Sequence, residues 1–158
     1  TGGTSPRLGG NEDSVWIKAA NEAYNWDHLN DVEACIRTHR HLMFKEDLDA
    51  EVYLREAYSL ATKSGRVKLF QNLPESETNY DIYPRLQEKY IHPHLKDLKI
   101  PTLLIWASED RTVPLKRGLL LLDLIPEGEM HIFTEAAHMV MYDRAEEFNR
   151  VLASFCRS

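Results

Sequence analysis

The fold is decided by residues 100–106, which read Ile-Pro-Thr-Leu-Leu-Ile-Trp. The continuous apolar run after the proline predicts a strand that is buried on both faces. Beyond a polar turn at 107–111, the sequence predicts a helix over 115–124, a second strand over 130–133 and a last helix over 145–156. The order strand, helix, strand, helix is typical of a parallel α/β layer.

Two strands are too few to complete such a layer. A strand with two apolar faces needs a helix layer on each side and a neighbouring strand on each edge, because every unpaired backbone group buried there costs free energy. We therefore expect this chain to complete its sheet with a second polypeptide or with a further part of a longer one.

The segment before the first strand has a helical period. Residues 11–64 predict three helices, the second beginning at Asn30 with Glu33 as a capping box and the third covering 49–63. The third is expected to stop at Gly65, and a short fourth helix is expected over 66–71. Five apolar side chains of the third helix are expected to point inward: Val52, Tyr53, Ala57, Leu60 and Ala61.

Residues 75–99 are polar and are interrupted by Pro84 and Pro93. This composition predicts irregular backbone with at most a helical turn over 86–90. The stretch is the candidate boundary between two parts of the chain.

Composition and charge narrow the function classes. The chain has 158 residues, 43% of them hydrophobic and 28% charged, which is typical of one globular domain. A net charge of -6 without a basic patch argues against nucleic acid and membrane surfaces as partners. No apolar run approaches the roughly 20 residues that cross a bilayer.

Cys35 and Cys156 lack zinc-binding spacing, so we expect no structural metal, no disulfide scaffold and a reducing, cytoplasmic location.

Two residues that carry chemistry follow the predicted strands. Asp110 and His138 each come soon after the C-terminal end of a strand, the edge where catalytic groups collect in open α/β sheets. A carboxylate there can accept the imidazole N–H, fix the tautomer and stabilise the imidazolium that forms when the histidine takes a proton from a serine. Glu109 is the competing acid, whereas Glu135 and Asp143 are expected on the surface.

The remaining histidine pairs do not form a metal-binding pattern. His39 and His41 are two apart in a helical stretch and point to different faces, and His92 and His94 flank a proline in a polar linker.

Three stretches together resemble the C-terminal part of an α/β-hydrolase. They are 100–114 (Ile-Pro-Thr-Leu-Leu-Ile-Trp-Ala-Ser-Glu-Asp-Arg-Thr-Val-Pro), 125–138 (Ile-Pro-Glu-Gly-Glu-Met-His-Ile-Phe-Thr-Glu-Ala-Ala-His) and 146–155 (Glu-Glu-Phe-Asn-Arg-Val-Leu-Ala-Ser-Phe). The resemblance implies that Asp110 is the acid of a catalytic triad and that His138 is its general base. No G-x-S-x-G nucleophile elbow occurs in the sequence, so the nucleophile is expected from outside it.

The resemblance also implies a domain layout. Residues 1–10 are then the connection from the preceding core strand, 11–94 the helical cap and linker, and 95–158 the C-terminal part of the hydrolase core. The expected fold class is α/β, the last part of an α/β-hydrolase sheet with a helical cap, incomplete without a second chain or segment.

Among hydrolases, the pattern Trp-x-x-x-Asp-Arg-x-Val-Pro-Leu-x-x-Gly at 106–118 is most similar to meta-cleavage-product hydrolases. The resemblance implies hydrolysis of a carbon–carbon bond in a vinylogous diketone, with a carboxylic ester as the open alternative. Val113 and Met139, beside the two catalytic residues, are expected to line an apolar substrate cavity under the cap. That family often has Trp in place of Met139 and Gly in place of Ala137, so the pocket is expected to differ in shape.

Other functions on the same fold stay open at this point. They are acyl transfer, an epoxide hydrolase or dehalogenase with an aspartate nucleophile, and a non-catalytic hydrolase-fold subunit. No cofactor or metal is expected. The implied partners are a small apolar substrate and a complementary N-terminal hydrolase chain that carries the nucleophile, so that this chain is one half of a cleaved or two-chain heterodimer. A homodimer of the assembled unit is compatible with this expectation.

Overall fold

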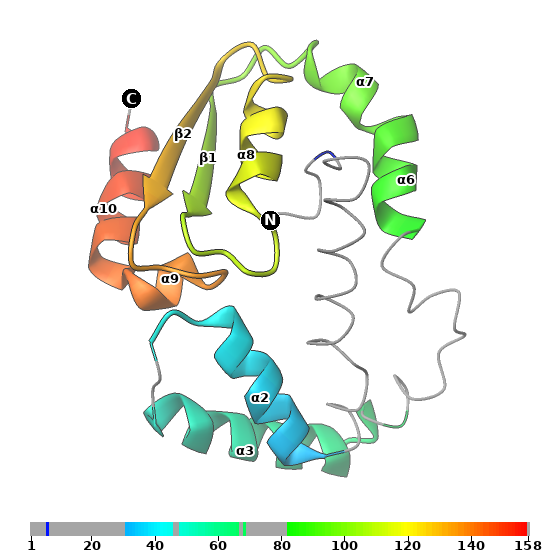
Figure 1. Cartoon of the computed structure of the whole chain (residues 1–158), viewed down its shortest axis with the longest axis vertical. Coiled ribbons are helices and arrows are strands. Elements are labelled where there is room, and N and C mark those ends of the chain that lie inside the picture. Colours follow the sequence, from blue (N-terminus) through cyan, green and yellow to red (C-terminus); the bar gives the residue numbers. More distant parts are fainter. Residues whose placement is uncertain (1–5, 7–30, 46–47, 67, 69–81, 158) are drawn as a thin grey trace.

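The centre of the fold is a parallel pair of strands (Figure 1). The computed structural model describes residues 6, 31–45, 48–66, 68 and 82–157. Strand β1 (Thr102–Ala107) pairs with β2 (Gly128–Phe133) in continuous register, and helix α8 (Leu115–Leu122) makes the connection. Both predicted strands and the parallel layer are confirmed, and β2 begins two residues before the predicted start. Within the described part of the chain, each strand pairs along one edge only.

The two faces of the sheet are covered by different helices. Figure 1 shows α8 and α10 (Ala145–Phe155) on opposite sides of the strands. Because successive side chains of a strand point to opposite faces, the apolar run divides into two clusters. The cluster on the α8 side contains Trp106, Val113, Leu121 and Ile125, with Leu104 and Met130 packed against it. The cluster on the α10 side contains Ala107, Phe133, Ala136 and Val140, with Ile105, Phe148 and Val151 packed against it. The prediction of a strand with two apolar faces is therefore confirmed.

Helices α2 (Val32–Leu42) and α3 (Leu48–Lys63), which belong to the predicted cap, pack against each other beneath the sheet in the view of Figure 1. Helix α2 starts at Val32, and the carboxylate of Asp31 accepts a hydrogen bond from the Glu33 N–H at 3.0 Å. The predicted start at Asn30 was therefore wrong by one residue, because the aspartate after it provides the N-cap acceptor. Asn30 itself lies outside the described residues.

The inward face predicted for α3 was wrong for its three largest members. Val52, Tyr53 and Leu60 are 67%, 69% and 58% exposed, and Leu54 is the buried residue. Leu54 lies on one stripe with half-buried residues three, four and seven positions later, which include Ala57 and Ala61. At 100° per residue the three exposed side chains fall well away from that stripe. The predicted stop is confirmed, since Gly65 adopts a left-handed φ of 75°.

Pro84 and Pro93 do not interrupt the helices in which they lie. Instead of irregular backbone, the structure has α6 (Ile82–Tyr90) and α7 (His92–Leu95). Pro84 and Pro93 lie in the first turns of these helices, where the missing N–H would have no intrahelical partner in any case. The sequence prediction treated both prolines as helix breakers, although proline is tolerated in the first turn of a helix. The prediction of irregular backbone was therefore wrong here.

Other predictions about the chain reach beyond the described residues. Most of the helix predicted over 66–71 lies outside them, as do most of residues 1–30, so the division at 1–10, 11–94 and 95–158 remains a prediction. Each helix in the described part of the chain falls short of the length and apolar character needed to cross a membrane.

The indole of Trp106 fixes the loop that follows β1. Its Nε1–H donates to the carbonyl of Val113 at 2.9 Å, and Trp106 is 5% exposed. Gly118 of α8 lies flat against the ring, since a Cβ added there would come within 2.7–3.0 Å of three ring atoms. The aromatic, valine and glycine positions of the 106–118 pattern therefore form one packed unit that closes the loop between β1 and α8.

We expect Gly118→Ala to lower the free energy of unfolding by about 1–3 kcal/mol, the usual cost of overpacking a core. Alanine gains only about 0.5–1 kcal/mol over glycine within a helix, so the clash with Trp106 decides the sign. Urea denaturation measures the difference. Leu119→Ala, at a position of the same helix that is 43% exposed, is the matched control and should cost less. A Gly118→Ala protein as stable as the wild type would contradict the tight contact.

Candidate active site

The parallel pairing brings two loops to one edge of the sheet. β1 and β2 end at paired residues, Ala107 and Phe133, so the loops that follow them start side by side. Asp110 from the first loop and His138 from the second are in contact, with 3.0 Å between Oδ2 and Nδ1. The Asp110 side chain is 7% exposed, and the His138 side chain is 30% exposed. The acid is thus buried behind an imidazole that remains accessible.

The two oxygens of Asp110 have separate partners. Oδ1 accepts hydrogen bonds from the backbone N–H groups of Thr112 and Val113, both at 2.8 Å. These bonds fix the plane of the carboxylate and leave Oδ2 for the imidazole. When Nδ1 donates to Oδ2, the other ring nitrogen of His138 carries the lone pair that a general base needs.

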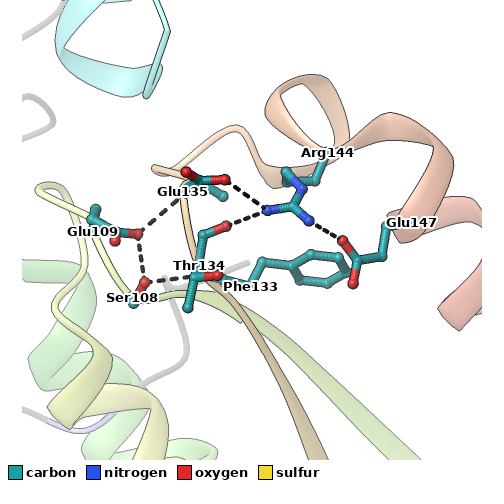
Figure 2. A network of polar contacts seen from close by, with 8 residues as sticks. Ser108, Glu109, Phe133, Thr134, Glu135, Arg144 and Glu147 are labelled. Atoms are coloured by element: carbon teal, nitrogen blue, oxygen red, sulfur yellow. Dashed lines mark hydrogen bonds and ion pairs between the residues drawn. The ribbon is translucent and has the colours of Figure 1, made fainter.

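Glu109, the competing acid, contacts other groups. Its Oε2 accepts a hydrogen bond from the Ser108 hydroxyl and lies 3.4 Å from the Ala136 N–H. The hydrogen bond from Ser108 lowers the pKa of Glu109 below its usual range. Figure 2 shows this carboxylate directed toward Ser108 and the start of the second loop. Of the two neighbouring acids, Asp110 is the one in contact with His138.

A polar network holds the start of the second loop (Figure 2). Ser108 N–H donates to the Phe133 carbonyl at 2.9 Å, which ties the end of β1 to the end of β2. Arg144, at the start of α10, donates to the Thr134 carbonyl at 2.8 Å and pairs with Glu147. The loop that leads to His138 is therefore fixed to both the sheet and α10 before it reaches the histidine.

Two further acids were expected on the surface. Glu135 lies there, with a side chain 72% exposed. Asp143 does not. Its half-buried carboxylate accepts a hydrogen bond from the Ala137 N–H at 2.9 Å and lies 3.1 Å, through each oxygen, from the Phe44 N–H. No pattern in the sequence indicated this role, because both donors are backbone groups and one of them is 99 residues away from Asp143.

Residues 41–44, which we call the cap neck, reach both loops from the end of α2. The N–H of Met139 donates to the Leu42 carbonyl at 3.1 Å. The His41 imidazole lies near Arg111 in the first loop: burial lowers the pKa of His41, and the positive charge of Arg111 lowers it further, against an opposing backbone hydrogen bond. The histidine pattern of the sequence had indicated only that His41 was a poor metal ligand.

The two residues predicted to line a substrate cavity have different surroundings. Val113 is 7% exposed and belongs to the cluster around Trp106. Met139 is half-buried beside the cap neck. Their contact with substrate remains a prediction. In the described ranges, no three His, Cys, Asp or Glu residues gather as metal ligands would.

No protein-family model matches the chain. A 2-hydroxy-6-oxononadienedioate/2-hydroxy-6-oxononatrienedioate hydrolase of Pseudomonas sp. is 32% identical over 68% of this chain and 39% of its own length. A 2-hydroxy-6-oxo-6-phenylhexa-2,4-dienoate hydrolase of Comamonas testosteroni is 33% identical over 59% of this chain and 34% of its own length. The chain thus spans well under half the length of these curated relatives.

Solved structures agree with the sequence relatives on the fold. A meta-cleavage product hydrolase from Pseudomonas fluorescens IP01 aligns with a TM-score of 0.69 at 23% identity, covering 80% of this chain and 46% of that one. The 2-hydroxy-6-oxo-6-phenylhexa-2,4-dienoate hydrolase of Rhodococcus sp. strain RHA1 aligns with a TM-score of 0.58 at 15% identity, covering 81% and 45%. The chain therefore has the fold of the C-terminal part of an α/β-hydrolase. Its homologues are meta-cleavage-product hydrolases, enzymes that hydrolyse a carbon–carbon bond.

We expect the protein to lose stability as the pH is lowered from about 7.5 to about 5.5, in part through His41. The folded-state pKa of His41 lies below its ordinary value of 6.5, so the unfolded chain binds this proton more readily. The contribution of neutral His41 to the free energy of unfolding is fully present above pH 6.5, and it is lost as the pH falls below that value. The measurement is urea denaturation at both pH values, in wild type and in His41→Gln. The glutamine variant should lose less stability between them, and equal losses would refute the assignment.

Proposed function

We propose that this chain supplies the acid and the general base of a serine-type α/β-hydrolase. The single observation that carries the proposal is the 3.0 Å contact between the Nδ1 atom of His138 and the buried carboxylate of Asp110. Hydrolase relatives at 32% and 33% identity over this part of the chain support it.

The proposed reaction divides the work between the two residues. His138 takes the proton of a serine hydroxyl as the serine oxygen attacks a substrate carbonyl, and Asp110 stabilises the imidazolium that results. The imidazolium then gives the proton to the leaving group. In the second half of the reaction, His138 takes a proton from water as the water oxygen attacks the acyl-enzyme, which releases the acid product and restores the serine. In a vinylogous diketone, the electron pair of the breaking carbon–carbon bond is delocalised toward the second carbonyl. This delocalisation lets a carbon-centred fragment act as the leaving group.

The nucleophile in this proposal comes from a segment outside these residues. No G-x-S-x-G elbow occurs among the 158 residues, and the relatives extend well beyond the part that this chain matches. We propose a complementary N-terminal hydrolase segment as the partner, which would also provide further strands for the sheet.

The proposed substrate is a vinylogous diketone, because the chain is similar to hydrolases of this substrate class. A carboxylic ester is the second candidate, because Met139 and Ala137 depart from the residues that often stand at those places in the resembling family. The cap neck lies against the loop of Met139, so this side chain is close to the boundary where a cap would enclose substrate.

In the complete hydrolase, this chain together with its nucleophile segment, we expect His138→Ala to abolish turnover and Asp110→Asn to lower kcat by about 10,000-fold. The asparagine can donate to Nδ1, which favours the wrong tautomer. Glu109→Gln is the matched control, because that neighbouring acid contacts Ser108 and not the histidine, and it should change kcat less than about tenfold. Steady-state kinetics at saturating substrate measure all three. Near-normal turnover in Asp110→Asn would overturn the assignment of the acid.

We also expect Met139→Trp to change substrate preference more than folding. A larger aromatic at this place should alter the ratio of kcat/KM for a vinylogous diketone and an ester by about tenfold or more. Competition between the two substrate classes measures the ratio, and urea denaturation controls for stability. An unchanged ratio would show that Met139 lies away from the substrate.

A further inference from the structure

We infer that Asp143 is a positioning residue that couples the cap neck to His138. The inference rests on the proposed function for its catalytic meaning, and on the hydrogen bonds of the described residues for its geometry. Asp143 ends the short helix α9 (Val140–Asp143), which lies opposite the end of α2 in Figure 1.

One carboxylate joins two distant segments. Ala137, whose N–H donates to Oδ2 of Asp143 at 2.9 Å, directly precedes the histidine. Phe44, whose N–H lies 3.1 Å from both oxygens, belongs to the cap neck. Two backbone donors on an anionic acceptor form charge-assisted hydrogen bonds, which are stronger than neutral ones.

The burial of Ala137 leaves its N–H group little alternative to Asp143 as an acceptor. Ala137 is fully buried, with an exposure of 0%, whereas Phe44, the second donor, is half-buried. An N–H group buried there without an acceptor would cost the full desolvation penalty. The Ala137 N–H group therefore depends on the carboxylate of Asp143 as its acceptor.

The backbone on both sides of His138 is tied to the cap neck. The N–H before the histidine, at Ala137, reaches the cap neck through Asp143. The N–H after it, at Met139, donates directly to the Leu42 carbonyl. A shift of the cap neck therefore moves the peptide units that carry the imidazole.

Asp110 has a separate anchor. Its carboxylate is fixed by the N–H groups of its own loop, which the Trp106 indole closes against α8. The alignment of His138 with Asp110 consequently depends on two supports: the core packing that closes the Asp110 loop, and the hydrogen bonds that tie the backbone around His138 to the cap neck. Misplacement of a catalytic group by about 1 Å can cost about 100-fold in rate.

The test compares three variants of the complete hydrolase. Asp143→Ala removes the acceptor of both N–H groups. Asp143→Asn can place its oxygen at the position of Oδ2, within reach of both donors, and acts as the conservative rescue. Asp123→Ala, which removes an exposed carboxylate at the end of α8, is the matched control. We expect kcat to fall about 100-fold in Asp143→Ala, about tenfold or less in Asp143→Asn and less than twofold in Asp123→Ala, with KM changing no more than about threefold.

Two NMR measurements test the coupling without turnover. In Asp143→Ala, amide hydrogen exchange at Phe44 and Ala137 should accelerate by about tenfold or more relative to Asp123→Ala. The downfield proton signal of the bond between His138 and Asp110 should shift or broaden in the same variant. A purely structural role would lower stability without changing this signal in the folded protein.

The outcomes separate the two proposals. If the wild-type enzyme turns over and Asp143→Ala retains its kcat within twofold, or if the alanine and asparagine variants lose equal activity, the role of Asp143 is refuted while the proposed function stands. If the wild-type enzyme has no hydrolase activity, the proposed function fails, and the NMR signals alone support or overturn the coupling of the cap neck to His138.

Discussion

The arrangement of this site depends on the two carboxylate oxygens of Asp110 having different hydrogen-bond partners. One oxygen is occupied by two backbone N–H groups of its own loop, and the other faces the imidazole of His138. A buried carboxylate needs several donors to offset its lost hydration, and here the chain supplies them within three residues. The parallel register of β1 and β2, and the packing of α8 on the loop, are the conditions under which the acid and the histidine meet.

Much of the hydrolase core could be predicted from the sequence because the determining features are local. The apolar run at 100–106 has two apolar faces, and the strand, helix, strand, helix order allows few topologies. The acid and histidine follow those strands closely, so correct strands imply that both residues lie at one edge of the sheet. This is why the proximity of Asp110 and His138 could be predicted from the sequence.

The helices before β1 and the contacts of Asp143 were predicted less well, for physical reasons that differ from place to place. Helix α3 has apolar residues around much of its surface, so its period does not say which stripe meets α2, and Tyr53 and Leu60 were placed on the wrong side. The helix over Ile82–Tyr90 was missed because its proline occupies a tolerated first-turn position. Asp143 was missed because its partners are backbone groups, and side-chain patterns carry no information about them.

The contact between Trp106 and Gly118 also restricts how this part of the sequence can evolve. A side chain at Gly118 has no room while the indole is present, and a smaller ring at position 106 would leave a void and lose the hydrogen bond to the Val113 carbonyl. Each single change is harmful, whereas a paired change could restore the packing. The two positions therefore form an epistatic pair, and lineages that depart from one of them are expected to depart from both.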